Sequence, residues 1–222
     1  MAITENGPGG SHRGRLGNVV YYDLDGKNVS REIGVSTKEP TELQLASRLG
    51  TAMSSVLFST MLDFIKTGFG VIAREAKDNA FNQAVKVNKK NMITGTYPNL
   101  QIAYHAIAVS KGPLMPAKNW QVTRVGLGLH YSWETDPEMP WPEVTDQVMM
   151  LAYFPRKEKV CFNLFGKSRS AGSDVLEIPL SLQGEYMETY ISFIAADRSQ
   201  VADSSYTGNF NLSISDNIIL LS

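Results

Sequence analysis

Apolar and polar residues alternate through most of the C-terminal half of this chain, in short segments separated by turn residues. The first segment has apolar residues at every second position: Val125, Leu127, Leu129, Tyr131 and Trp133. The same spacing recurs over 148–154, 160–164 and 187–195. A period of two is typical of a β-strand with one buried face and one face in water. Several such strands at short spacing predict a β-sandwich.

We expect the sandwich to occupy residues 118–222. Its strands are predicted at 121–133, 146–154, 158–165, 174–180, 186–196, 200–210 and 217–221. The longest loop, at 134–146, joins the first two strands and is rich in proline and acidic residues.

The N-terminal segment is rich in glycine and poor in core-forming residues. Residues 1–17 have no apolar face, so this arm should be flexible unless a neighbouring subunit or the protein's own domain holds it. Two short runs then flank Asp25-Gly26, a dipeptide favoured in type I′ turns. They predict a β-hairpin at 18–33.

A helical region is predicted next. Thr41 to Gln44 fit a capping box, and the helix should run to about Lys66, before the glycines at 68 and 70. Its apolar face predicts burial of four residues: Leu49, Met53, Val56 and Phe64.

A second helix is expected at about 71–91, with Asp78 as an internal cap. A turn at 91–99 and a strand at 101–110 should follow. The fold class is therefore α+β, mainly β. We expect three parts: the arm and hairpin at 1–40, a helical layer at 41–117, and the sandwich at 118–222.

Composition and charge limit the classes of protein and the locations that we expect for this chain. The chain has 222 residues, 43% of them hydrophobic and 19% charged, with a net charge of −1, which fits a globular protein without a global field toward nucleic acid. The first residues show no secretory signal, and no apolar run is long enough to span a membrane. We expect a virion or cell-surface assembly, reached without a cleaved signal, or otherwise the cytoplasm.

Catalytic signals are weak throughout. Phe165 to Ser168 end like a phosphate-binding loop, but Cys161 occupies the position of its first glycine. The three histidines lie far apart and lack metal-ligand spacing. We therefore expect no catalytic, cofactor-binding or metal-binding residues and no enzymatic activity.

Two surface clusters are candidates for binding. The first lies in the arm and hairpin and provides the expected assembly contacts: Arg13, Arg15, Tyr21, Tyr22 and Arg31. Nucleic-acid binding usually needs a denser basic stripe, so an acidic protein neighbour is favoured.

The second cluster is the loop at 134–146, with Trp141 among three carboxylates: Asp136, Glu138 and Glu143. An indole beside carboxylates can hold a glycan, a cation or a protein. The alternative is that Trp141 packs on the edge of the sheet.

Two resemblances follow from motifs. The order Tyr131-Ser132-Trp133, an acidic loop, then Leu180, Gly184, Tyr186 and 190–193 resembles a fibronectin type III domain over about half of the chain. The whole chain is similar to a bacterial family of unknown function, through its Gly-rich opening, Pro40-Thr41 with Gln44, and the segments 81–102 and 110–114. This resemblance implies no reaction or cofactor. Relatives among phage and prophage genes would imply that the protein is a structural component.

The sequence therefore predicts a non-enzymatic structural or assembly protein, a component of a phage particle or surface appendage. Its arm would contact copies of itself or other structural proteins. The alternative is a ligand-binding or glycan-binding module that uses the loop around Trp141.

Overall fold

The computed structural model describes residues 2–4 and 10–211, and the chain divides into two compact units, residues 1–41 and 42–222. More of the described residues lie in strands than in helices, which confirms the α+β, mainly β class. The sequence suggested a further boundary between 117 and 118, whereas the helices and both large sheets lie in the second unit. The strand predicted at 217–221 falls outside the described residues.

The first unit contains an antiparallel sheet in which each strand pairs with its neighbour in sequence. Its strands are β1 (Ala2–Thr4), β2 (His12–Leu16), β3 (Val19–Leu24) and β4 (Lys27–Glu32). Asp25 and Gly26 have φ values of 50° and 75°, as a type I′ turn requires, so the predicted hairpin is present. The described parts of the arm are the strands β1 and β2, which extend this hairpin into a sheet.

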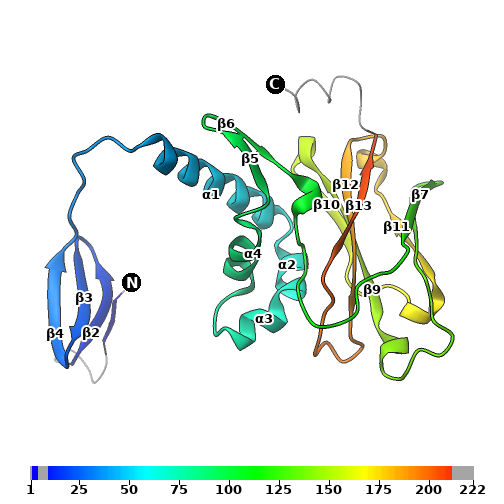
Figure 1. Ribbon diagram of the computed structural model, residues 1–222, viewed down its shortest axis with the longest axis horizontal. Coiled ribbons are helices and arrows are strands. Elements are labelled where there is room, and N and C mark those ends of the chain that lie inside the picture. Colours follow the sequence, from blue (N-terminus) through cyan, green and yellow to red (C-terminus); the bar gives the residue numbers. More distant parts are fainter. Residues whose placement is uncertain (1, 5–9, 212–222) are drawn as a thin grey trace. The chain divides into compact units, whose positions relative to one another are not determined.

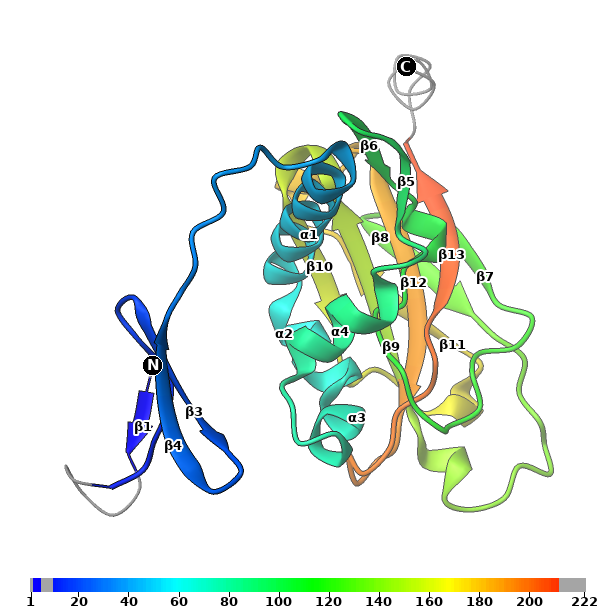
Figure 2. The ribbon, with the colours of Figure 1, turned by 60° about the vertical axis from the view of Figure 1, so that its left-hand side comes forward.

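The second unit is built in three layers, which Figures 1 and 2 show from two directions. Helices lie on one face of a four-stranded sheet, and a three-stranded sheet covers its other face. Two apolar cores result, one between the helices and the four-stranded sheet and one between the two sheets.

Both sheets are antiparallel. The larger has the order β10-β9-β12-β13 and consists of β9 (Gln147–Phe154), β10 (Lys159–Asn163), β12 (Met187–Ile194) and β13 (Ser205–Phe210). The smaller has the order β11-β8-β7 and consists of β7 (Gln121–Val125), β8 (Gly128–Ser132) and β11 (Ser173–Glu177). The single strand predicted at 121–133 is wrong, because a turn at Gly126 and Leu127 folds it into the β7–β8 hairpin.

Strands β9 and β12 are buried on both faces. Alternate residues of β9 enter different cores: Met150 and Phe154 pack between the sheets, whereas Met149 and Leu151 pack toward the helices. All eight residues of β12 are buried. The expected wet face is wrong for these two strands, because the helices cover the side that an open antiparallel sheet leaves in water.

The helical layer contains α1 (Glu42–Thr60), α2 (Leu62–Gly68), α3 (Gly70–Glu75) and α4 (Ala80–Asn88). The helix predicted to reach Lys66 is interrupted at Met61, which is buried. Phe64 is buried as predicted, but Val56 is 52% exposed, and Leu49 and Met53 are half-buried. The buried residues of α1 lie toward its C-terminal end: Ser54, Leu57 and Phe58.

The single helix predicted at 71–91 is wrong, because the chain forms α3 and α4 there, and the cap of α4 lies one residue after the predicted one. Asn79 caps this helix, its side chain accepting a hydrogen bond from the Asn82 backbone N–H at 2.7 Å. Asp78, the predicted cap, instead accepts from the Asn79 backbone and from the side chains of Asn82 and Gln83. Both residues are good caps, and the chain uses the second.

Asn88 ties the end of α4 to a distant segment. Its side-chain amide donates to the carbonyls of Ala84 and Ala108, both at 2.9 Å, and its Oδ1 accepts from the Ala108 N–H at 2.7 Å. In the sequence between Asn88 and Ala108 lies a hairpin formed by β5 (Ile93–Thr96) and β6 (Asn99–Ile102). The sequence predicted a turn at 91–99 in this region. The strand predicted at 101–110 ends at Ile102 and gives way to a short 3-10 turn, η1 (Tyr104–Ala106).

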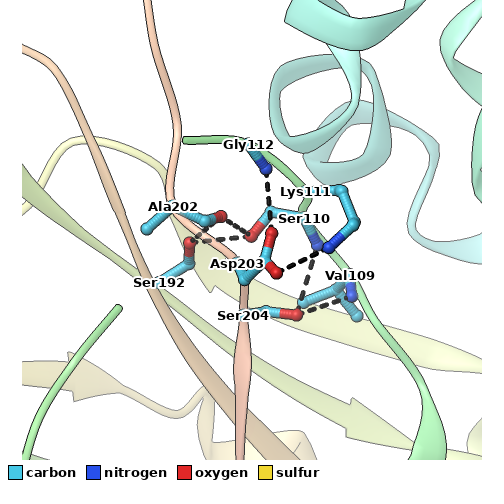
Figure 3. A network of polar contacts seen from close by, with 8 residues as sticks. All are labelled: Val109, Ser110, Lys111, Gly112, Ser192, Ala202, Asp203 and Ser204. Carbon is cyan, nitrogen blue, oxygen red and sulfur yellow. Dashed lines mark hydrogen bonds and ion pairs between the residues drawn. The ribbon is translucent and has the colours of Figure 1, made fainter. Parts of the chain in front are cut away.

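The segment after η1 is fixed to β12 and to residues 202–204, which precede β13, by a polar network (Figure 3). Ser110, fully buried, donates to the Ser192 hydroxyl at 2.7 Å and to the Ala202 carbonyl at 2.9 Å. Asp203 accepts from the Gly112 N–H at 3.0 Å and pairs with Lys111 at 2.6 Å. The motif at 110–114 therefore has a structural role, joining the helical layer to β12 and β13.

Candidate interaction surfaces

The N-terminal sheet has no core of its own. Among its residues whose burial is described, none is buried, and Ile3, Leu16 and Leu24 are each more than half exposed. A small sheet usually needs a packed face to be stable in water. Within the described part of the first unit, nothing packs on either face of this sheet.

The strand register sorts the charges of this sheet between its faces. Val20 pairs with Arg15 on one side and with Arg31 on the other, Tyr22 pairs with Val29, and Leu24 pairs with Lys27. Residues directly opposite each other, and residues two apart on a strand, share a face. We call this set the cationic face: Arg15, Val20, Tyr22, Leu24, Lys27, Val29 and Arg31.

The opposite face has a different character. It presents Tyr21, Ser30 and the two carboxylates Asp23 and Glu32. Arg13 makes an ion pair with Asp23 at 3.8 Å. Of the expected assembly contacts, Arg15, Tyr22 and Arg31 therefore lie together, whereas Tyr21 faces the other way and Arg13 is paired within the sheet.

The loop at 134–146 is held at its base by a buried ion pair. The Arg169 guanidinium lies 3.2 Å from the Asp146 carboxylate, and both side chains are almost fully buried. Arg169 also donates to the Met115 carbonyl at 2.7 Å and stacks on the Phe193 ring at 3.8 Å. Removing either partner would leave a buried charge, so this pair fixes where the loop ends.

Trp141 does not pack on the sheet. It is 79% exposed, so the expectation that it covers a sheet edge is wrong. It borders a depression of about 400 Å³ whose polar lining includes Glu143, Asp197 and Gln200. A tryptophan this exposed provides a large apolar surface for a partner.

The predicted loop carboxylates are at the surface. Asp136 accepts a hydrogen bond from the Glu138 N–H at 2.9 Å, forming a local turn, and all three of Asp136, Glu138 and Glu143 are exposed. Asp136 and Glu143 line a second depression of about 280 Å³, together with Lys118 and Arg169. Of the predicted ligand-loop residues, Trp141 therefore lines the first depression, Asp136 the second and Glu143 both.

Sequence reasoning missed a buried carboxylate in β12. Glu188 is 2% exposed and accepts hydrogen bonds from the hydroxyls of Tyr186 and, at 2.6 Å, Tyr206. Burial raises the pKa of the Glu188 carboxyl, and the two tyrosine hydrogen bonds oppose that rise. The Glu188 and Tyr190 side chains are on the helix side of the sheet, where Tyr190 donates to the Tyr104 carbonyl at 2.8 Å.

The described residues offer little for covalent chemistry. Burial raises the pKa of the Cys161 thiol, which disfavours the thiolate that a nucleophile needs. In residues 2–4 and 10–211, no group of three or more metal-ligating side chains is found, and no helix is long and apolar enough to cross a membrane.

Comparison with known proteins places the chain in a family. A family model described as "Family of unknown function (DUF6266)" matches residues 11–208, most of the chain. The chain belongs to the DUF6266 family. No match to a curated protein was found. The predicted resemblance to a family of unknown function is thereby confirmed, and the match includes both the β2–β4 region of this DUF6266 protein and the three-layered unit.

Proposed function

We propose that this DUF6266 protein is a non-enzymatic structural protein, a component of a phage particle or surface appendage, that assembles through its N-terminal sheet. The observation that carries the proposal is the absence of any buried residue among the described side chains of that sheet. Ordering a residue costs about 1–2 kcal/mol of backbone entropy, which a sheet without a core offsets poorly. A partner that covers one face supplies the missing burial.

The second unit supports the same proposal. It is packed around two apolar cores. The polar groups of β12 and of the network around Ser110 make hydrogen bonds within the unit. We also propose that its seven-stranded sandwich is of the fibronectin type III kind. Trp133 in its core supports this, being buried and packed edge-on against Phe193 at 5.4 Å between ring centroids.

Two residues depart from the pattern of fibronectin type III domains. The Tyr186 hydroxyl donates to Glu188 rather than to backbone upstream, as a tyrosine corner would, and Leu180 is 77% exposed. Superposition of an experimental structure on fibronectin type III domains tests this part. A different strand order in either sheet would exclude it.

The assembly proposal is tested by removing residues 2–33. Light scattering and sedimentation velocity over a wide concentration range should show that the full-length chain forms oligomers and that the truncated chain stays monomeric. The thermal transition of the second unit should be unchanged by the truncation, because its cores lie within 42–211. Leu180→Ala, which removes an exposed apolar side chain from the second unit, is the matched control and should assemble normally.

A monomeric full-length chain at every concentration would contradict self-assembly. Normal assembly of the truncated chain would contradict the role of the sheet. Electron microscopy of phage particles or cell surfaces with an antibody to the second unit then tests the proposed setting.

A second candidate function is glycan binding, favoured by the 79% exposure of Trp141 beside a depression lined by Glu143, Asp197 and Gln200. Trp141→Ala should abolish retention on a glycan panel while leaving the melting temperature within about 1 °C, since surface substitutions change stability little. No retention of the wild-type protein would eliminate this function.

A further inference from the structure

The two exposed surfaces of this protein carry opposite charge. The cationic face of the sheet presents Arg15, Lys27 and Arg31 and no carboxylate. The loop at 134–146 contains five carboxylates and no lysine or arginine: Glu134, Asp136, Glu138, Glu143 and Asp146. Asp146 is buried against Arg169, which leaves four carboxylates at the surface.

We propose that the cationic face of one molecule binds the acidic loop of a second copy, in a head-to-tail contact. This inference rests on the proposed assembly function and names the partner of that surface. The charge complementarity of the two surfaces is the first argument, because it steers encounter and selects the partner.

The apolar groups of the two surfaces also match. Trp141 stands 79% exposed among the carboxylates, and the cationic face presents Val20, Tyr22 and Val29 between its cations. In the register Arg15–Val20–Arg31, an indole lying over Val20 would have a guanidinium on each side. Arginine beside an aromatic ring adds cation–π attraction, and tryptophan, tyrosine and arginine are the usual anchors of protein interfaces.

The loop is held in place before it binds. The Asp146–Arg169 pair anchors its end, and backbone hydrogen bonds from Met139 to Asp136 and from Val144 to Pro140 form turns within it. A preorganised loop loses little conformational entropy on association. Its carboxylates therefore remain positioned for cations that arrive from another molecule.

A contact between two different surfaces has a geometric consequence. After one contact is made, the pair of molecules still has one free cationic face and one free loop, so contacts can repeat around a ring or along a filament. A contact of the sheet with itself would instead stop at a dimer.

The experiment uses two full-length variants. The sheet variant carries Arg15→Glu and Arg31→Glu, and the loop variant carries Glu138→Lys and Trp141→Ala. The four side chains changed are all exposed, so both variants should fold, and circular dichroism is the check. Ser30→Glu, on the opposite face of the sheet, and Glu177→Lys, at an exposed position of β11, are the matched controls.

We expect each variant alone to be monomeric where the wild-type chain and both controls form higher oligomers. An equimolar mixture of the two variants should form only heterodimers, because the intact loop of one can bind the intact face of the other. Trp141→Ala alone should weaken association roughly thirty-fold, as loss of an interface anchor does. Raising the salt concentration from about 0.05 M to about 1 M should weaken wild-type association, because it screens exposed charges.

Three results would overturn the inference. Wild-type-like assembly of the loop variant would show that the sheet binds some other partner surface, and the proposed assembly function would survive. A mixture that remains monomeric would exclude the head-to-tail contact. A wild-type chain that is monomeric at every concentration would remove the assembly function together with the inference.

Discussion

The helix-facing side of β9 provides the sharpest test of the three-layered fold. Leu151 is fully buried and packs toward the helices, and Met150, its neighbour, is fully buried between the sheets. Leu151→Ala removes three carbons from a site without solvent, at about 0.8 kcal/mol for each buried CH2. The cavity that remains adds to this transfer term, so the total cost should be about 2–5 kcal/mol.

The assay is equilibrium unfolding in urea, followed by circular dichroism. Met150→Ala should cost about the same as Leu151→Ala, since both faces of the strand are buried. For a protein of this size the loss corresponds to a fall in melting temperature of roughly 5–15 °C. Leu43→Ala, in which a leucine that is 84% exposed is truncated in the same way, is the control and should change stability by less than about 0.5 kcal/mol.

The decisive outcome is the comparison of the two faces. If Leu151→Ala behaves like Leu43→Ala while Met150→Ala is costly, the helices do not cover this sheet. The fold would then be an open sandwich with one wet face, and the reasoning above would be refuted.

Three further predictions concern other parts of the second unit. Asn88→Ala should lower the unfolding free energy by about 2–4 kcal/mol in denaturant titration, because it leaves the Ala108 N–H and C=O without their partner. Asn91→Ala, at an exposed position, is the control and should leave the unfolding free energy unchanged. Gly112→Ala should lower the melting temperature, because a Cβ there would lie 2.2 Å from the Val201 carbonyl oxygen, whereas Gly70→Ala meets no atom within 4 Å and should melt normally. Burial raises the pKa of Tyr153 to about 12, so the folded protein keeps a proton that the unfolded chain releases at about pH 10. The contribution of Tyr153 to the unfolding free energy is fully present below about pH 10 and is lost as the pH rises toward about 12. Urea titrations that give the same unfolding free energy across that range would contradict this prediction.

Local signals in the sequence were sufficient for the first hairpin and for the strands β9, β10 and β12. Asp25-Gly26 fixed the turn, and a two-residue turn also fixes which residues face each other across β3 and β4. That register places Arg31 and Tyr22 on one face and Glu32 on the other. The sequence grouped Tyr21 with Tyr22, and the pairing that places Arg15 required the structure, because residues 1–17 were expected to be flexible.

Other features depend on contacts between distant residues. A period of two cannot tell whether helices cover the second face of β9, because that depends on where another layer packs. Arg169 lies 23 positions from Asp146, and no local pattern marks the two as a pair. The exposure of Trp141 depends on the path of the whole loop, which is why the sequence left its packing open.

The order of the layers along the chain has a consequence for synthesis. The helices are made first, and their apolar residues Leu57, Phe58 and Phe64 have no sheet to cover them until β9 and then β12 have left the ribosome. Ser110 cannot close its network until Ala202 and Ser204 are made. Domains fold as their chain emerges, and an uncovered apolar layer in the meantime is a binding site for chaperones. The nascent chain of this protein therefore exposes the apolar side of its helices until β9 and β12 are made, and its four-stranded sheet is complete only when β13 is added.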